Sequence, residues 1–307
     1  MREWTAHFLH LPARVAAVAG VTFTQLVRMR LFLVLAVFAL GFLGLQFVPY
    51  QDHLGIEFRG VQQLQLIKDV AVGCMQLFGL IFCVAATALL IPRDSEDRIL
   101  YTILCKPVPR FDYLAGKALG VLALLLGMLL FMDGLMSLLL WLRESSLAEE
   151  LRAALEAQGY SAAECQPYLD QVHEAGNTWN TQRGVLAMFL GFAVLTTLTL
   201  LFSCFTSGTI VSMIFALGAY FIGMFQGQFF HALAAGSDRA GISELMQRAG
   251  SVCSVLLPDF GLFAISDTAG AGAVLEAGLL GQLALIAVAY MLLHLLIATW
   301  IFAHKEF

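Results

Sequence analysis

The residues that could do chemistry in this sequence are few, and most lie within long apolar stretches. Asp133 is the one carboxylate well inside such a stretch, and His294 lies inside another. An ionisable side chain in an apolar segment is costly to bury without a partner, so both residues are candidates for a functional site. Asp133 could equally hydrogen-bond to Ser137 on the next helical turn, or to another helix, and serve packing alone. For His294, a hydrogen-bonded histidine in the protein core is the favoured interpretation.

Hydroxyl and thiol side chains form a second set of polar groups. One apolar stretch carries four hydroxyl residues, which commonly bond back to their own helix but could also line a polar path: Thr196, Thr197, Thr199 and Ser203. The six cysteines include no C-x-x-C pair and no histidine at ligand spacing, so we expect core residues and no metal site. Cys165 and Cys253 fall outside the apolar stretches, where an oxidising compartment would permit a disulfide.

Motifs that define common enzyme classes are absent. Gly116-Lys117 is followed by Ala118 and lacks the upstream glycine of a P-loop, so we expect no ATP site on this chain. The sequence also lacks H-E-x-x-H, G-x-S-x-G and any Ser/His/Asp grouping at readable spacing. We therefore expect no catalytic residue and no cofactor on this chain, with a constellation assembled from distant helices as the alternative.

The composition places these residues in a membrane. The 307 residues are 60% hydrophobic and 13% charged, which is more apolar surface than one soluble core of this size could hide. A helix needs about 20 apolar residues to cross a bilayer core of about 30 Å. We expect an all-α integral membrane protein, one domain over 1–307, with six spans at 31–48, 70–91, 118–142, 184–205, 209–228 and 273–302.

The distribution of basic residues predicts the orientation. If both termini and the 92–117 segment face the cytoplasm, that side holds ten of the 17 basic residues but only six of the 22 acidic ones. We therefore expect a protein of the cytoplasmic (inner) membrane with both termini inside, in contact with lipid and without a nucleic-acid partner. Residues 12–30, which end on Arg28 and Arg30, are predicted to form a helix in the cytoplasmic interface.

Two segments between the spans are expected outside. Residues 143–183 are predicted to form a small helical hairpin, with Pro167 shifting or kinking the start of its second helix. Residues 229–272 are too apolar for a solvated loop and too broken for a span, which suggests a short re-entrant helix. The hairpin prediction is based on two capping-box patterns, two C-terminal glycines and one leucine face: Ser146-x-x-Glu149, Ser161-x-x-Glu164, Gly159, Gly176, Leu147, Leu151 and Leu155.

The segment 92–117 is the one densely charged interval between two long apolar stretches, and it holds three of the seven prolines. Asp94 or Ser95 could cap a helix there, and Pro107 would end it. That helix would be amphipathic and lie on the membrane surface, followed by a rigid turn at 106–110 that leads into the third span. Its apolar stripe consists of Ile99, Leu100, Ile103 and Leu104.

This segment resembles the signature of the type-2 exporter family of ATP-binding-cassette (ABC) permeases. Arg98-Ile99 stands where that family usually has Gly-Thr. Residues 22–33 resemble its N-terminal interfacial helix, and 257–260 resemble its Leu-Pro-Asn-Phe element. Among subgroups the chain looks closest to permeases related to the copper-site maturation transporter of nitrous oxide reductase. The main match is carried by Glu96-Asp97, 103–110, Tyr113-Leu114 and Gly116-Lys117.

The resemblance implies the membrane half of a transporter. Its partners would be a second permease, identical or related, and separate nucleotide-binding subunits that carry ATP and magnesium. The helix within 94–105 would then be the coupling helix that docks on the ATPase. The residues assigned to this coupling are Asp94, Glu96, Asp97, Arg98, Ile99, Leu100, Ile103, Leu104, Lys106, Pro107 and Arg110. The alternatives are a channel or structural membrane subunit that docks a cytoplasmic partner without ATP, and an integral membrane enzyme. The sequence identifies neither the cargo nor its direction.

Overall fold

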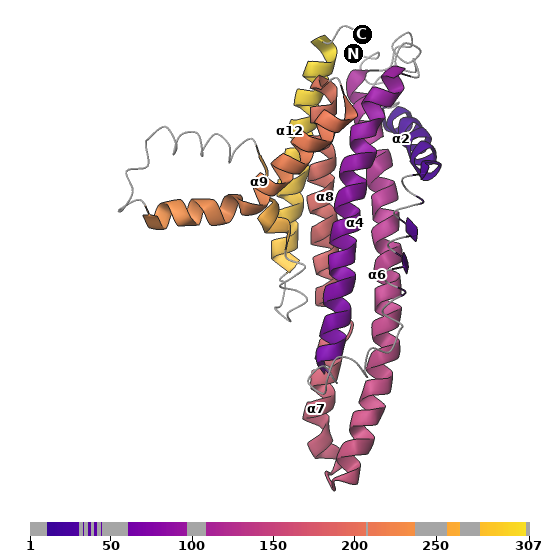
Figure 1. Cartoon of the computed structure of the whole chain (residues 1–307), viewed down its shortest axis with the longest axis vertical. Helices are drawn as coiled ribbons and strands as arrows, with labels where there is room; N and C mark the ends of the chain where they lie inside the picture. The colour runs from indigo at the N-terminus through magenta and orange to yellow at the C-terminus, as the bar shows by residue number, and fades with distance from the viewer. Residues whose placement is uncertain are drawn as a thin grey trace, which may run out of the picture.

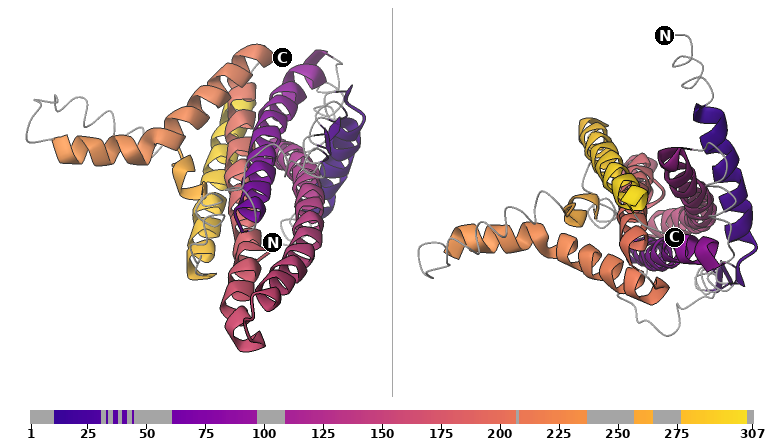
Figure 2. Two further views of the ribbon diagram at one scale, coloured as in Figure 1. Left: turned by 60° about the horizontal axis from the view of Figure 1, so that its bottom comes forward. Right: turned by 90° about the horizontal axis from the view of Figure 1, so that it is seen from above.

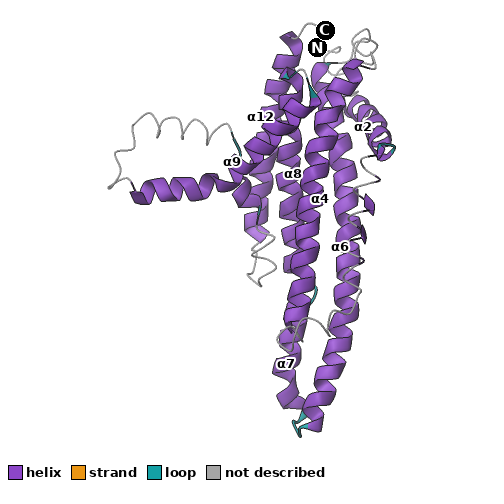
Figure 3. Cartoon of the chain, in the orientation of Figure 1, coloured by secondary structure: helices purple, strands orange, loops and turns teal. Residues whose placement is uncertain are grey.

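A computed structural model of the chain describes residues 11–30, six single positions between 33 and 44, and 61–96, 109–206, 208–236, 257–264 and 277–304. Within these ranges the regular elements are helices and none is a strand (Figure 3), which confirms the all-α prediction. The elements are α2 (Leu11–Val27), α4 (Val61–Glu96), α6 (Arg110–Ala157), α7 (Ala162–Ala175), α8 (Trp179–Phe205), α9 (Thr209–Gly236), the 3-10 helix η2 (Phe260–Phe263) and α12 (Ala277–His304).

Five helical stretches in the described part of the chain are long and apolar enough to cross a membrane. They are Val61–Asp94, Arg110–Ala157, Ala163–Phe205, Thr209–Gly227 and Gly278–His304. These stretches correspond to five of the six predicted spans. Several such helices in one chain indicate a multi-pass membrane protein. The predicted first span, 31–48, falls mostly outside the described residues.

The long helices form an elongated bundle. Helices α4, α6 and α8 run side by side, α12 lies along α8, and α2 lies against α6 near the end of the bundle where α6 begins (Figure 1). Helix α4 has 36 residues and α6 has 48, so they are about 54 and 72 Å long at 1.5 Å per residue. Both exceed a bilayer core of about 30 Å. The bundle therefore continues beyond the membrane, and α6 turns into α7 at its far end.

Helix α4 extends further than expected at both ends. The predicted span was 70–91, but the helix runs through Pro92 to Glu96, so Asp94 and Ser95 lie inside it and do not cap a new helix. A proline within a helix leaves the carbonyl four residues earlier without its usual donor. Here that carbonyl, of Ala88, accepts a hydrogen bond from Ser203 Oγ on α8 at 3.4 Å. The neighbouring helix thus compensates for the proline.

The hairpin predicted for 143–183 forms, but its first helix is a direct continuation of α6. Ser146 does not start a helix, because its Oγ donates to the Leu142 carbonyl at 3.0 Å within α6. The predicted capping box at Ser146-x-x-Glu149 is therefore wrong. The second box is present at the start of α7, where the Ser161 backbone N–H donates to Glu164 Oε2 at 2.8 Å.

Two glycines define the hairpin's turns for different reasons. Gly159 follows α6 with a φ of 88°, a conformation that side chains disfavour, as expected for a C-terminal glycine. Gly176 ends α7 with a φ of −69°, but a Cβ there would lie 2.1 Å from Glu144 Oε2. The glycine leaves room at this turn for the Glu144 side chain of α6. Pro167 lies within α7 and does not set its start.

The described parts of 229–272 do not include a separate re-entrant helix. Residues 229–236 continue α9, whose C-terminal part points away from the bundle (Figure 2). Residues 257–264 contain η2, where Asp259 Oδ1 accepts from the Gly261 N–H at 2.9 Å. The remainder of the segment lies outside the described residues.

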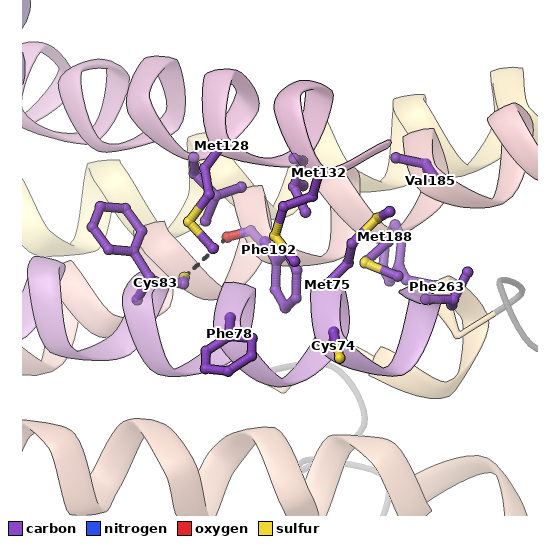
Figure 4. Packing of buried hydrophobic residues seen from close by; sticks show 14 of the residues in the cluster. Cys74, Met75, Phe78, Cys83, Met128, Met132, Val185, Met188, Phe192 and Phe263 are labelled. Atoms are coloured by element: carbon purple, nitrogen blue, oxygen red, sulfur yellow. Dashed lines mark hydrogen bonds between the residues drawn. The ribbon is translucent and has the colours of Figure 1, made fainter. Parts of the chain in front are cut away.

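The core lies between α4, α6 and α8. Met75 and Cys83 of α4 face Met132 of α6 and Phe192 of α8 (Figure 4). A Cβ on Gly79 would lie 2.5 Å from a ring carbon of Phe192, so this glycine admits the aromatic ring between the helices. The core thereby fixes the relative positions of the three helices that carry the candidate site residues.

Candidate functional site

Side chains from both ends of the predicted coupling segment meet between the end of α4 and the start of α6. Asp94 Oδ2, in the last turn of α4, lies 2.6 Å from Lys117 Nζ of α6. The Tyr113 hydroxyl, one turn before Lys117, donates to the same oxygen. All three side chains are buried. We call these residues, Asp94, Tyr113 and Lys117, the ion-pair clamp, since they join the two helices on either side of 97–109.

The clamp is connected to α2 by polar contacts. Lys117 Nζ lies 3.5 Å from Gln25 Oε1, and Arg14 Nε lies 2.9 Å from Asp112 Oδ2. Asp112 is buried at the start of α6, so its charge is balanced from α2. The predicted interfacial helix is therefore held against the first turns of α6 by side chains at two levels.

Two glycines let the backbones of α2 and α6 approach. A Cβ on Gly116 would lie 2.6 Å from Val18 Cβ, and one on Gly120 would lie 2.6 Å from Thr22 Cβ. The spacing Gly116-x-x-x-Gly120 places both on one helix face, the small-residue arrangement that brings membrane helices together. Sequence reasoning missed this contact, although the G-x-x-x-G spacing was available to predict it.

The start of α6 is also connected to α12. Arg110 Nη1 donates a hydrogen bond to the Ala303 carbonyl in the last turn of α12. The rings of Tyr113 and Phe302 stack with centroids 5.9 Å apart. Four helices, α2, α4, α6 and α12, therefore meet directly beside the predicted coupling segment.

Three of the eleven predicted coupling residues belong to the described chain. Asp94 is buried in the clamp, Glu96 is exposed at the end of α4, and Arg110 begins α6. Asp94 is buried and joins the end of α4 to α6 through Lys117. The other eight lie outside the described residues, so the coupling helix stays a prediction: Asp97, Arg98, Ile99, Leu100, Ile103, Leu104, Lys106 and Pro107.

Asp133 forms the centre of a second polar group. It is only 7% exposed on α6, and Gln182 Nε2 of α8 lies 3.2 Å from its Oδ1. The same amide nitrogen lies 3.3 Å from Ser137 Oγ and 3.3 Å from Asn177 Oδ1. The sequence left open whether Asp133 bonds to Ser137 or to another helix. Its hydrogen-bond partner is Gln182, on another helix. A cavity of about 380 Å³ opens beside it.

His294 and the hydroxyls of α8 are engaged in helix packing. His294 is buried, and its Nδ1 lies 3.2 Å from Thr197 Oγ1, which joins α12 to α8. Thr196 and Thr199 donate to carbonyls of their own helix at 2.8 Å each. With Ser203 bonded to α4, these four hydroxyl residues serve packing and not an open polar path.

No group of three or more potential metal ligands occurs among the described residues. Cys165 is buried with a free thiol, and Cys253 lies outside the described part, so the proposed disulfide is untested. A comparison with family models found no match, and a search of the curated proteins found none either. The family resemblance therefore stands on the residues of the sequence alone.

Proposed function

We propose that this chain is the membrane-spanning permease subunit of an ABC transporter of the type-2 exporter family. It crosses the cytoplasmic membrane six times with both termini inside. A separate nucleotide-binding subunit supplies ATP hydrolysis, and a second permease chain completes the membrane part. The observation that carries the proposal is the ion-pair clamp at the base of 97–109.

The clamp gives a structural reason for motif residues that suggested the family. Tyr113 and Lys117 hold the Asp94 carboxylate, and Gly116 admits α2 against α6. A connection that only had to join two spans would not need a buried ion pair between them. A pair in this position fixes the spacing between the two helices that carry the segment, which a docking element needs in order to transmit movement.

The same contacts supply a route for coupling. Closure of an ATPase dimer would push on 97–109, and the clamp would pass that push to α4 and α6 together. Through Arg14, Gln25 and Arg110, the start of α6 also moves α2 and α12. Packed helices move as rigid bodies between discrete arrangements, so a local push becomes a rearrangement of the bundle.

Exposed tryptophans support the position of the membrane. Trp300, near the clamp, is 67% exposed, while Trp141 and Trp179 lie toward the opposite end and are 63% and 82% exposed. Along α6, Lys117 and Trp141 are about 36 Å apart at 1.5 Å per residue. Tryptophan is enriched at both interfaces of a bilayer core of about 30 Å. This spacing fits a membrane with the clamp at its inner boundary.

The proposal is tested by co-expression and co-purification with a candidate ABC ATPase subunit, identified by its P-loop. Ile103→Asp and Leu104→Asp should each place a charge on the apolar docking stripe and abolish the association. His304→Asp, at the exposed end of α12 on the same side, is the matched control and should retain it. Unchanged association in both stripe variants would refute the coupling assignment. A co-purifying partner without ATPase activity would favour the rival function, a channel or structural subunit.

A further inference from the structure

The cavity beside Asp133 lies at a junction of three chain segments. Asp133 and Ser137 come from α6, and Asn177 from the short connection between α7 and α8. The other three lining residues lie at the start of α8. Its volume of about 380 Å³ falls within the range of small-ligand sites, about 300–1,000 Å³. The described residues that line it are Asp133, Ser137, Asn177, Thr178, Trp179 and Gln182.

The charge of this cavity is that of a single carboxylate. Asp133 is the one ionisable group among the described lining residues, and the other polar groups are neutral amides and hydroxyls. Thr178 is the N-cap of α8, so the positive end of that helix borders the cavity and favours the ionised carboxylate. Gln182 provides one hydrogen bond to it. The carboxylate therefore has one amide donor, and no basic side chain lines the cavity in the described chain.

An aromatic side chain lines the same cavity as this carboxylate. Trp179 lines the same cavity and is 82% exposed, far more than a ring of this size needs for helix packing. A tryptophan face attracts a cation by its quadrupole, and the recognition of quaternary ammonium ligands is the usual functional case. The cavity thus combines a buried carboxylate, neutral hydrogen-bonding groups and an exposed indole ring. This combination fits a ligand that carries a positive charge and N–H donors.

We propose that the Asp133 cavity binds a small organic ammonium group. The Asp133 carboxylate is the counter-ion, Ser137 and Asn177 accept N–H hydrogen bonds, and the Trp179 ring covers the carbon substituents. Asp133 lies about 24 Å along α6 from Lys117, close to the far boundary of the bilayer core. The ammonium can therefore come from a free amine or from the head group of a lipid. The inference is independent of the proposed transporter function, because binding here requires no ATPase.

The test uses the full chain in a maltoside detergent, with tryptophan fluorescence as the signal and ethanolamine hydrochloride as the probe. We expect a saturable change with ethanolamine, and none with sodium chloride at equal ionic strength or with ethylene glycol. Trp179→Phe should abolish the change, since Trp179 is the one tryptophan among the described residues that line the cavity. A parallel titration with dioctanoyl phosphatidylethanolamine, against dioctanoyl phosphatidylglycerol, distinguishes a lipid head group from a free amine.

The decisive variant is Asp133→Asn, which keeps the shape and removes the charge. We expect ethanolamine affinity to fall about tenfold or more, as for loss of a charged hydrogen-bond partner. Asp170→Asn, an exposed carboxylate on α7, is the matched control and should bind normally. Should Asp133→Asn fail to fold, Trp179→Ala measured by calorimetry should weaken binding by about two- to fivefold. A wild-type chain without a saturable response to either amine, or variants that bind as tightly as wild type, would overturn the proposal.

Discussion

Neutralising Lys117 tests whether the ion-pair clamp holds the end of α4 to the start of α6, on either side of the predicted coupling segment. Lys117→Met keeps the length of the side chain but leaves Asp94 buried without its cation. Asp94 Oδ1 makes no hydrogen bond to a described residue, so Tyr113 would be the remaining donor to this carboxylate. Removal of one partner from a buried ion pair costs about 3–5 kcal/mol, which is about a hundredfold or more in the unfolding equilibrium.

The companion variant Asp94→Asn with Lys117→Met removes both charges. A neutral pair of similar shape avoids the buried charge, so the double variant should regain most of the lost stability. Both are measured by unfolding in mixed detergent micelles, followed by tryptophan fluorescence, and compared in a double-mutant cycle. Additive losses in the cycle, or a cost of under about 1 kcal/mol for Lys117→Met, would contradict a coupled buried pair.

Two further changes test the packing and the topology. Gly120→Leu should displace α2, because a Cβ there would lie 2.6 Å from Thr22 Cβ, at a cost of about 1–3 kcal/mol in thermal unfolding. Gly127→Leu on the same helix has open space and should be tolerated; equal effects would refute the close approach. Ala157→Cys, exposed at the end of α6, should react with an impermeant thiol reagent in intact cells, and protection would place the hairpin inside.

The sequence predicted the helices well because apolar length is a strong signal. It failed where a distant residue decides a local outcome. Pro92 was expected to stand at the end of a helix, but Ser203 on α8 satisfies the carbonyl that the proline leaves free. Ser146 matched a capping pattern, yet the helix continues through it. Local pattern alone does not contain the tertiary contact that overrides it.

The candidate sites could likewise be predicted only in part, because the sequence shows single unusual residues but not their partners on other helices. Asp133 stood out because a carboxylate in an apolar helix is rare, but its partner Gln182 lies 49 positions away. The clamp was missed because Asp94 and Lys117 belong to different helices, on either side of the connecting segment. The contact between α2 and α6 is different, because the spacing Gly116-x-x-x-Gly120 is a sequence pattern that predicts close helix packing. Pairing across helices needs the fold, while spacing along one helix does not.

Because α6 is long, a small change in its tilt at one end produces a large displacement at the other end. Its 48 residues form one helix from the clamp at one end to the hairpin tip at the other. The part of α6 beyond Lys117 is about 60 Å long at 1.5 Å per residue, so a tilt of about 5° pivoting near Lys117 would swing the tip by about 5 Å. A displacement of that size is enough to open or close a contact on the far side of the membrane. A small movement of α6 at the clamp would therefore become a larger one at the hairpin.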